Sequence, residues 1–255
     1  MQKLKFQVVV YFFLLIISVS NSYGQDERLN LGNIVAINLQ FGIGTTAGDL
    51  NDRFGTTLSL GAGMDFITEK NNLILGWKGD FHFGNNVKED VLGGLAPLGF
   101  IFGNSLSPAN ELRRAQRGSY LGIHIGKIFP LSSNNSRSGI RFTLGGGLLQ
   151  HRIRLQQDPL NFVPQIAGEY GRGYDRLTNG FALRQFLGYQ LLGNDKLVNF
   201  TFGLEFIEGF TQNRRNFNFD EMSVDTERRL DLIIGVKVGW TLPFYIGEST
   251  GEIFY

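Results

Sequence analysis

The residues best suited to chemistry are an aspartate and a histidine separated by one position, Asp80 and His82. Side chains two positions apart in a β-strand point to the same face, so a strand here would hold the carboxylate beside the imidazole. Such a pair can activate a water molecule for hydrolysis by general acid–base catalysis. The chain has two further histidines, His124 and His151, and no cysteine. We expect neither a metal nor a cofactor.

Whether this pair reacts depends on the element that carries it, and one kind of element dominates the chain. Between Leu230 and Phe244, apolar residues alternate with small or polar ones, and only Ile233 breaks the alternation. A period of two is the pattern of a β-strand whose two faces meet different surroundings. A tilted strand needs about 9–11 residues to cross a bilayer, so this segment is long enough.

The same alternation recurs along the chain, including the segment that carries Asp80 and His82. The predicted strands are 33–44, 56–66, 72–84, 119–127, 139–155, 177–191, 197–210 and 230–244. The links at 68–71 and 192–196 are short, the link at 129–138 is intermediate, and the remaining links, among them 85–118, are long. Barrels of the outer membrane have an even number of strands, short periplasmic turns and long external loops. The order of the links fits that architecture.

The charged residues decide which face of the strands points inward. A soluble lipocalin-like barrel has the same period with its apolar side chains directed inward around a ligand. Here charges of both signs lie on the face with the small residues, as in the polar lumen of a membrane barrel. Lys237 would be compensated there by opposite charges such as Asp231 or Glu205. The predicted lumen network consists of Asp65, Lys78, Asp80, Arg141, Arg184, Glu205, Asp231 and Lys237.

Composition agrees with a barrel. A hydrophobic content of 42% and a mean hydropathy of -0.05 do not suit a bundle of membrane helices. The 34 glycines leave room in a narrow barrel, and the 23 phenylalanines suit the two membrane interfaces. A net charge of +1 gives no electrostatic argument for nucleic acid, which we do not expect as a partner. We predict an all-β fold, an antiparallel up-and-down eight-stranded transmembrane β-barrel with long external loops, in residues 25–245.

The N-terminus has the pattern of a secretory signal peptide. Lys3 and Lys5 precede an apolar core from Val8 to Ile17, and small residues follow up to Gly24. The core is shorter than the roughly 20 residues that a membrane-anchoring helix needs, which disfavours that alternative. We predict a signal peptide over 1–24 and a short periplasmic tail over 246–255.

From Asn33 to Phe244 the chain resembles the small, eight-stranded outer-membrane β-barrel proteins of Gram-negative envelopes. The resemblance implies a place in the outer membrane, contact with its lipid including lipopolysaccharide, and insertion by the barrel-insertion machinery. In that superfamily an aromatic residue ending the last strand is the insertion signal. Trp240, Phe244 and Tyr245 match this signal, but the chain continues to Tyr255, which leaves open which aromatic end is used.

The resemblance also bears on the candidate dyad. An Asp-x-His pair at a barrel rim resembles the dyad of omptin-type proteases, which place a water between acidic residues and a histidine. Omptins have ten strands and a second acidic pair, and this sequence shows neither. We therefore favour Asp80 and His82 as members of the packed lumen network. An outer-membrane hydrolase with this rim dyad is the alternative, as is a narrow gated pore.

The long link at 85–118 is the least expected part of the chain. Val91 to Gly103 is apolar without clean alternation, and Ser107 to Gln116 is expected to form a short helix. The link forms either a lid on the barrel mouth or a docking surface for an envelope protein. His151–Arg154 and Arg214–Arg215 could bind lipopolysaccharide phosphates, although ordinary solvated charge is favoured for both.

Without a credible catalytic set or a wide lumen, the sequence favours a structural role. We predict a non-enzymatic outer-membrane barrel that acts as a structural or accessory (adaptor) subunit of a cell-envelope assembly, such as a secretion or membrane-biogenesis complex.

Overall fold

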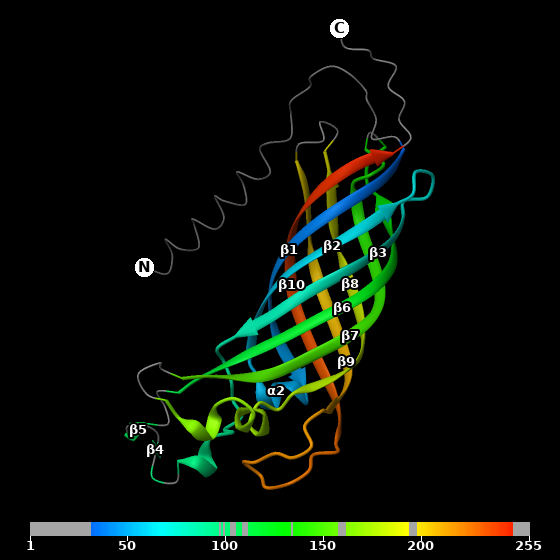
Figure 1. Ribbon diagram of the computed structural model, residues 1–255. Helices are drawn as coiled ribbons and strands as arrows, with labels where there is room; N and C mark the ends of the chain where they lie inside the picture. The colour runs from blue at the N-terminus through cyan, green and yellow to red at the C-terminus, as the bar shows by residue number, and fades with distance from the viewer. Residues whose placement is uncertain are drawn as a thin grey trace, which may run out of the picture.

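The computed structural model describes residues 32–96, 98, 100–102, 106–108, 112–133, 135–157, 162–193 and 198–246. Within these ranges, eight long strands close into one barrel in the order β1-β10-β9-β8-β7-β6-β3-β2 (Figure 1). The barrel strands are β1 (Asn33–Gly48), β2 (Thr56–Ile67), β3 (Leu73–Gly84), β6 (Arg113–Pro130), β7 (Gly139–Gln156), β8 (Thr178–Leu192), β9 (Asn199–Asn213) and β10 (Arg228–Ile246). The predicted fold class is confirmed.

All neighbouring barrel strands pair antiparallel, and β1 closes the ring against β10 over the whole of its length. The described chain begins and ends at one end of the barrel, where residues 68–72 join β2 to β3, where β6 ends beside the start of β7 and where β8 ends beside the start of β9; we call this the turn end. The longer connections gather at the opposite end, which we call the loop end (Figure 1). The predicted signal peptide and the tail beyond Ile246 lie outside the described residues.

The two faces of the strands are as different as the sequence predicts. Ile123 on β6 points outward and is 69% exposed, whereas Asp231 on β10 points inward and is 0% exposed. Outward apolar residues form a belt around the barrel, which includes Leu39, Phe41, Leu121, Ile125, Leu148, Phe202 and Trp240. A belt of this kind around a polar interior is stable in lipid and not in water, so the barrel spans a membrane. Among the described residues, no helix is long and apolar enough to cross a bilayer.

Strands pack closely where glycine replaces a side chain. A methyl group at Gly147 on β7 would lie 2.3 Å from the carbonyl oxygen of Leu121 on β6, and one at Gly145 would lie 2.5 Å from that of Ile123. Gly145 and Gly147 therefore mark a close approach of two strands inside the barrel, as predicted, whereas Gly146 faces the Phe181 side chain; a strand continues through all three.

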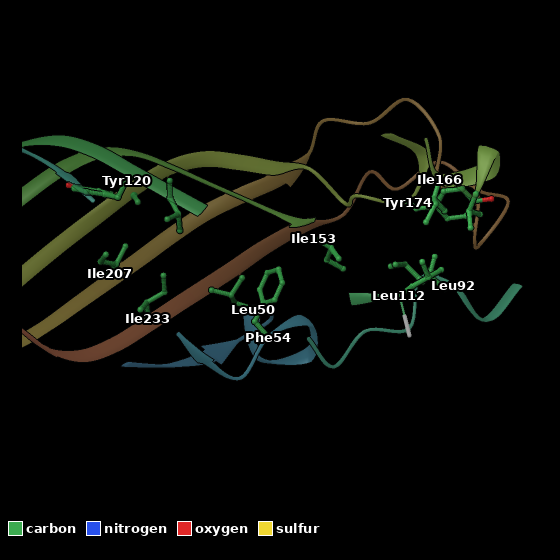
Figure 2. Packing of buried hydrophobic residues seen from close by; sticks show 14 of the residues in the cluster. Leu50, Phe54, Leu92, Leu112, Tyr120, Ile153, Ile166, Tyr174, Ile207 and Ile233 are labelled. Carbon is green, nitrogen blue, oxygen red and sulfur yellow. The ribbon is translucent and has the colours of Figure 1, made fainter. Parts of the chain in front are cut away.

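Ile233, the exception in the alternation of β10, lies in an apolar layer inside the barrel at the loop end. Together with Tyr120 and Ile207 it faces the loop between β1 and β2, which folds back into the barrel mouth (Figure 2). That loop carries the short helix α2 (Leu50–Arg53), and Leu50 and Phe54 are buried against the layer. The connection is thus a plug, although the sequence suggested a long external loop.

The remaining loops pack on this plug and extend the apolar cluster away from the membrane. Figure 2 shows Leu92, Leu112, Ile166 and Tyr174 beyond Phe54, and all are buried. We call this folded layer of loops the cap. Its short elements are η1 (Gly93–Leu95), β4 (Phe100–Phe102), β5 (Leu106–Pro108), η3 (Pro164–Ile166) and η4 (Tyr170–Gly173).

The predicted helix over Ser107–Gln116 is wrong. Leu106–Pro108 pairs with Phe100–Phe102 as a small hairpin, and Arg113 already belongs to β6. β6 begins six residues earlier than the alternation indicated. Its pairing with β7 overrides the helical propensity of the Glu-Leu-Arg-Arg stretch. The small hairpin stands outside the barrel, whose strand number remains even.

The turn end is closed by a second apolar layer and by one buried arginine. Ile34, Ile67, Ile74 and Ile128 are buried there. Beneath them Arg137 donates to the carbonyl oxygen of Thr68 and to the Asn72 side chain, each at 2.7 Å, and to the carbonyl oxygen of Gly32. The segment 135–138, which precedes β7, is thereby tied across the barrel opening.

Candidate functional site

Five charged side chains fill the middle of the barrel and define what we call the lumen layer: Lys78, Asp80, Arg184, Glu205 and Lys237. Glu205 is central, because its carboxylate lies 2.9 Å from Lys78 Nζ, 2.6 Å from Arg184 Nη2 and 3.0 Å from Lys237 Nζ. Asp80 lies 2.9 Å from Lys237 Nζ and 3.3 Å from Lys78 Nζ. Each charge has at least one opposite charge within contact distance, although the five come from four strands.

Nearer the turn end, Asp65 forms a second group with His124 and Arg141. Its carboxylate lies 2.7 Å from His124 Nε2 and 2.6 Å from Arg141 Nη2, and it accepts a hydrogen bond from Asn38 at 2.8 Å. Nearer the loop end, Asp231 lies 2.7 Å from His151 Nε2 and accepts a hydrogen bond from Thr211 at 2.5 Å. The sequence suggested Asp231 or Glu205 as the counter-charge of Lys237. In the structure Glu205 and Asp80 contact Lys237, whereas Asp231 contacts His151.

Inside the barrel the predicted network is buried and balanced. Its four cations and four anions are all buried. Two spaces among these side chains are small: one beside Asp65 and Lys78 and one beside His82 and Glu205 each amount to about 10 Å³. That is at the lower limit of the space one water molecule needs. The arrangement can hold charge inside the lumen, and its ion pairs cross the space that a solute would have to use.

The candidate dyad lies within this packed interior and not at an open rim. Asp80 is engaged by Lys237 and Lys78. His82 is buried, and neither of its ring nitrogens has a hydrogen-bond partner among the described residues. Phe54 of the plug packs edge-on against the neighbouring His151, with ring centroids 5.8 Å apart. A substrate would have to displace the cap and the plug to reach either residue.

At the turn end, the residues predicted as an insertion signal occupy the last part of β10. Trp240 and Phe244 point outward and are exposed, and Tyr245 pairs with Ile34 of β1 and packs against the apolar layer there. Their role in insertion stays a prediction, and Tyr255 lies outside the described residues.

Sequence reasoning missed a second set of ion pairs, which joins the loops of the cap. We call it the mouth cluster: Arg53, Glu89, Arg176, Asp220, Glu221, Asp225 and Arg229. Arg176 Nη2 lies 2.6 Å from Asp220 and 2.8 Å from Glu221, while Arg53 Nε lies 2.9 Å from Glu89. The acids around 220–227 are visible in the sequence, but their partners lie on other loops.

The mouth cluster shifts the acidity of its members in different directions. Burial raises the pKa of Asp220. The hydrogen bond from Arg176 lowers the pKa of Glu221. For Asp225, burial acts to raise the pKa, but the hydrogen bonds from Arg229 and the Glu227 amide and the nearby arginine charges together hold it below its usual value.

The basic residues that were considered for binding lipopolysaccharide have different surroundings in the structure. Arg215 binds Asp175 through two hydrogen bonds of 2.7 and 2.5 Å, and Arg214 binds Asn179. His151 points into the barrel. Arg152 and Arg154 are exposed on the outside of β7.

No family model and no curated protein matches the chain. Among solved structures, it is similar to the attachment invasion locus protein Ail of Yersinia pestis in complex with the heparin analogue sucrose octasulfate, at 10% identity, 83% of this chain, 99% of that chain and a TM-score of 0.38. A second Ail structure gives 6% identity with the same coverage and TM-score. The N-terminal β-barrel domain of Pseudomonas aeruginosa OprF gives 9% identity, 82% and 98% coverage and a TM-score of 0.34. The assignment as a small eight-stranded membrane barrel rests on the strand pairing and surface of the chain itself.

Proposed function

We propose that the protein is a non-enzymatic barrel of the outer membrane that serves as a structural or accessory (adaptor) subunit of a cell-envelope assembly, such as a secretion or membrane-biogenesis complex. It would be inserted by the barrel-insertion machinery, with the turn end in the periplasm and the cap outside. The observation that supports this most strongly is a barrel closed at both ends that carries a folded cap.

The closed interior argues against transport. Apolar layers lie at both ends of the lumen, and the lumen layer between them joins strands from opposite sides of the barrel by ion pairs. Conduction requires an ion to bind and leave along a continuous polar path. Here such a path would break both the apolar layers and the paired charges.

The same burial argues against the hydrolase alternative. A general base must reach the proton that it abstracts, directly or through one water. His82 is 1% exposed, and Asp80 already accepts a hydrogen bond from Lys237. The pair is placed to fill the lumen and has no room for a peptide or a lipid.

The cap supplies the surface for a partner, but not where the sequence suggested it. Within the apolar stretch 91–103, Val91, Leu92 and Ile101 are buried in the cap and explain why the loop is apolar. The outer side of the cap nevertheless exposes Leu98 at 83% and Met222 at 74%. Their loops adjoin, since a methyl group at Gly94 would lie 3.8 Å from the carbonyl oxygen of Asp220. Exposed apolar side chains beyond the lipid belt favour contact with a protein.

Photo-crosslinking on intact envelopes tests this role. A crosslinking amino acid is placed at Met222 of the cap, and the matched control is placed at Leu131, an equally apolar and exposed residue at the turn end. We expect a discrete adduct from position 222 only. The double variant Met222→Ser/Val224→Ser should lose the partner that co-purifies with the wild-type protein in mild detergent. A wild-type protein recovered as a monomer without adducts contradicts the adaptor role.

A further inference from the structure

The outer wall of the barrel carries a group of arginines on one hairpin, above the lipid belt at the loop end. β6 and β7 pair with each other beyond the ends of their pairing with β3 and β8, and this extension leads toward the cap (Figure 1). Their outward positions in this extension hold Arg113, Arg117, Arg152 and Arg154, which we call the arginine ladder.

Strand register places the ladder directly above the lipid. Leu121 and Leu148 form the last apolar pair on this hairpin, Ser119 and Gln150 follow, and then Arg117 pairs with Arg152. Four residues of a tilted strand rise about 10 Å above that apolar pair. The headgroup layer beside a bilayer core is about 5–8 Å thick on each side. An arginine side chain that bends toward the membrane therefore reaches this layer.

Within the described part of the chain, the ladder has fewer close counter-charges than the arginines of the mouth cluster. In that part of the chain Arg117 donates to the carbonyl oxygen of Gln116, at 2.7 Å, and has no ion pair. Arg152 forms a long ion pair of 3.8 Å with Asp175, which is already bound by Arg215. Among the described residues, neither Arg113 nor Arg154 has an ion pair or a side-chain hydrogen bond. In the mouth cluster, by contrast, Arg53 and Arg176 contact carboxylates at 3.0 Å or less.

Arg117 and Arg152 repel each other unless an anion lies between them, because they are direct cross-strand neighbours. The guanidinium group binds phosphate through two parallel hydrogen bonds, so phosphate is the anion that suits the ladder best. The ladder is on the outside of the barrel wall, in line with the apolar belt and away from the lumen. An anion that reaches it together with acyl chains on that belt is a lipid.

We propose that the arginine ladder binds the phosphates of a phosphorylated lipid headgroup, of the lipid A class, in the leaflet at the loop end. Arg117, Arg152 and Arg154 contact the phosphates, while the acyl chains lie on Leu121 and Leu148. This inference rests on the proposed placement in the outer membrane and is independent of the adaptor role.

Native mass spectrometry of the full-length protein, purified from membranes in detergent, measures this binding directly. The probes are diphosphorylated lipid A, the same lipid without its phosphates, and inorganic phosphate. The triple variant Arg117→Ser/Arg152→Ser/Arg154→Ser should raise the Kd for diphosphorylated lipid A by about tenfold or more. Lysine at the same three positions should give an intermediate Kd, because it keeps the charge without the planar donor pair.

The matched control is Arg172→Ser, which removes an exposed arginine from the cap, away from the ladder, and should leave the Kd unchanged. Heat-modifiable gel migration verifies folding, and the single variants Arg152→Ser and Arg154→Ser replace the triple variant if it does not fold. Equal affinity of wild type and ladder variant, or equal binding of the dephosphorylated lipid, overturns the proposal. Ladder-dependent binding of inorganic phosphate without binding of lipid A would assign the ladder to soluble anions and also overturn the proposal. If the wild-type protein has no co-purifying partner but binds lipid A through the ladder, the adaptor role is contradicted and the lipid-binding proposal stands.

Discussion

The lumen layer and the mouth cluster are both networks of arginine or lysine with aspartate or glutamate, yet they are built differently. In the lumen layer all five side chains are buried and are held by strands, and Glu205 alone contacts three cations. In the mouth cluster exposure ranges from 3% for the Arg176 side chain to 53% for that of Glu221, and most members lie on loops. Charges that register fixes inside a barrel act as a structural core, whereas charges on loops tie the loops to one another.

Removing the centre of the lumen layer should have the largest effect. Glu205→Ala leaves Lys78, Arg184 and Lys237 with only Asp80 as an opposite charge, so we expect a loss of about 3–5 kcal/mol in the free energy of unfolding. Unfolding in urea, followed by heat-modifiable migration, measures it. The matched control is Glu208→Ala on the same strand, because Glu208 points outward and makes only a 3.4 Å hydrogen bond with Gln185. Equal losses for the two variants would contradict a structural role for the layer.

The plug separates the two networks, and shortening its aromatic residue tests that separation. Phe54 is buried between the apolar layer and His151, so Phe54→Ala should cost about 3 kcal/mol through lost burial and the cavity left behind. Hydrogen exchange should then increase in the cap and in residues 49–55, while the strand amides next to Glu205 stay protected. Loss of protection throughout the barrel would show that the two networks form one unit.

The candidate dyad should contribute less than either network. If Asp80 and His82 formed an isolated pair, removing the imidazole would leave the Asp80 carboxylate without a partner. In the structure Asp80 is instead paired with Lys237 and Lys78. His82→Ala should therefore lower stability by about 1 kcal/mol, mainly through lost packing. Assays with peptide and lipid substrates should detect no turnover in either protein. Wild-type turnover that disappears in His82→Ala at unchanged stability would establish the hydrolase.

Acid should loosen the mouth cluster by a small amount. The pKa values of Glu221 and Asp225 are lowered in the folded cap, so the stability that they contribute is complete above their ordinary pKa values and is lost as pH falls through the folded values. Asp220 has a raised pKa and opposes this trend, so the test uses Asp220→Asn. Limited proteolysis of residues 214–227 should accelerate below about pH 4 in this variant. Cleavage rates that stay constant between neutral pH and pH 3 would contradict the expected loss of cap stability in acid.

The barrel could be predicted from the sequence because its physical cause is local. The alternation of apolar with small or polar residues predicts which residues of each strand point inward. Ile233 is an inward residue that is apolar, because it belongs to the apolar layer beneath the plug. The start of β6 was predicted too late. Residues from Arg113 to Gly118 lie above the apolar belt, where the outward positions do not face lipid and need not be apolar. The ion pairs needed the stagger between strands, which a single sequence does not contain. For the same reason His151 could not be assigned to Asp231. The pairing of β6 with β7 overrode the helix-like stretch before Gln116.

The central claim is that paired charges close the barrel, and single-channel recording in planar bilayers tests it most directly. The wild-type protein should give no stable conductance steps, and none should arise after protease removes the cap, because the lumen layer persists below it. Charge changes at Lys237 should alter stability without producing conductance. Regular conductance steps from the intact wild-type protein, altered in size by Lys237→Gln or Glu205→Gln, would contradict the account and establish a gated pore.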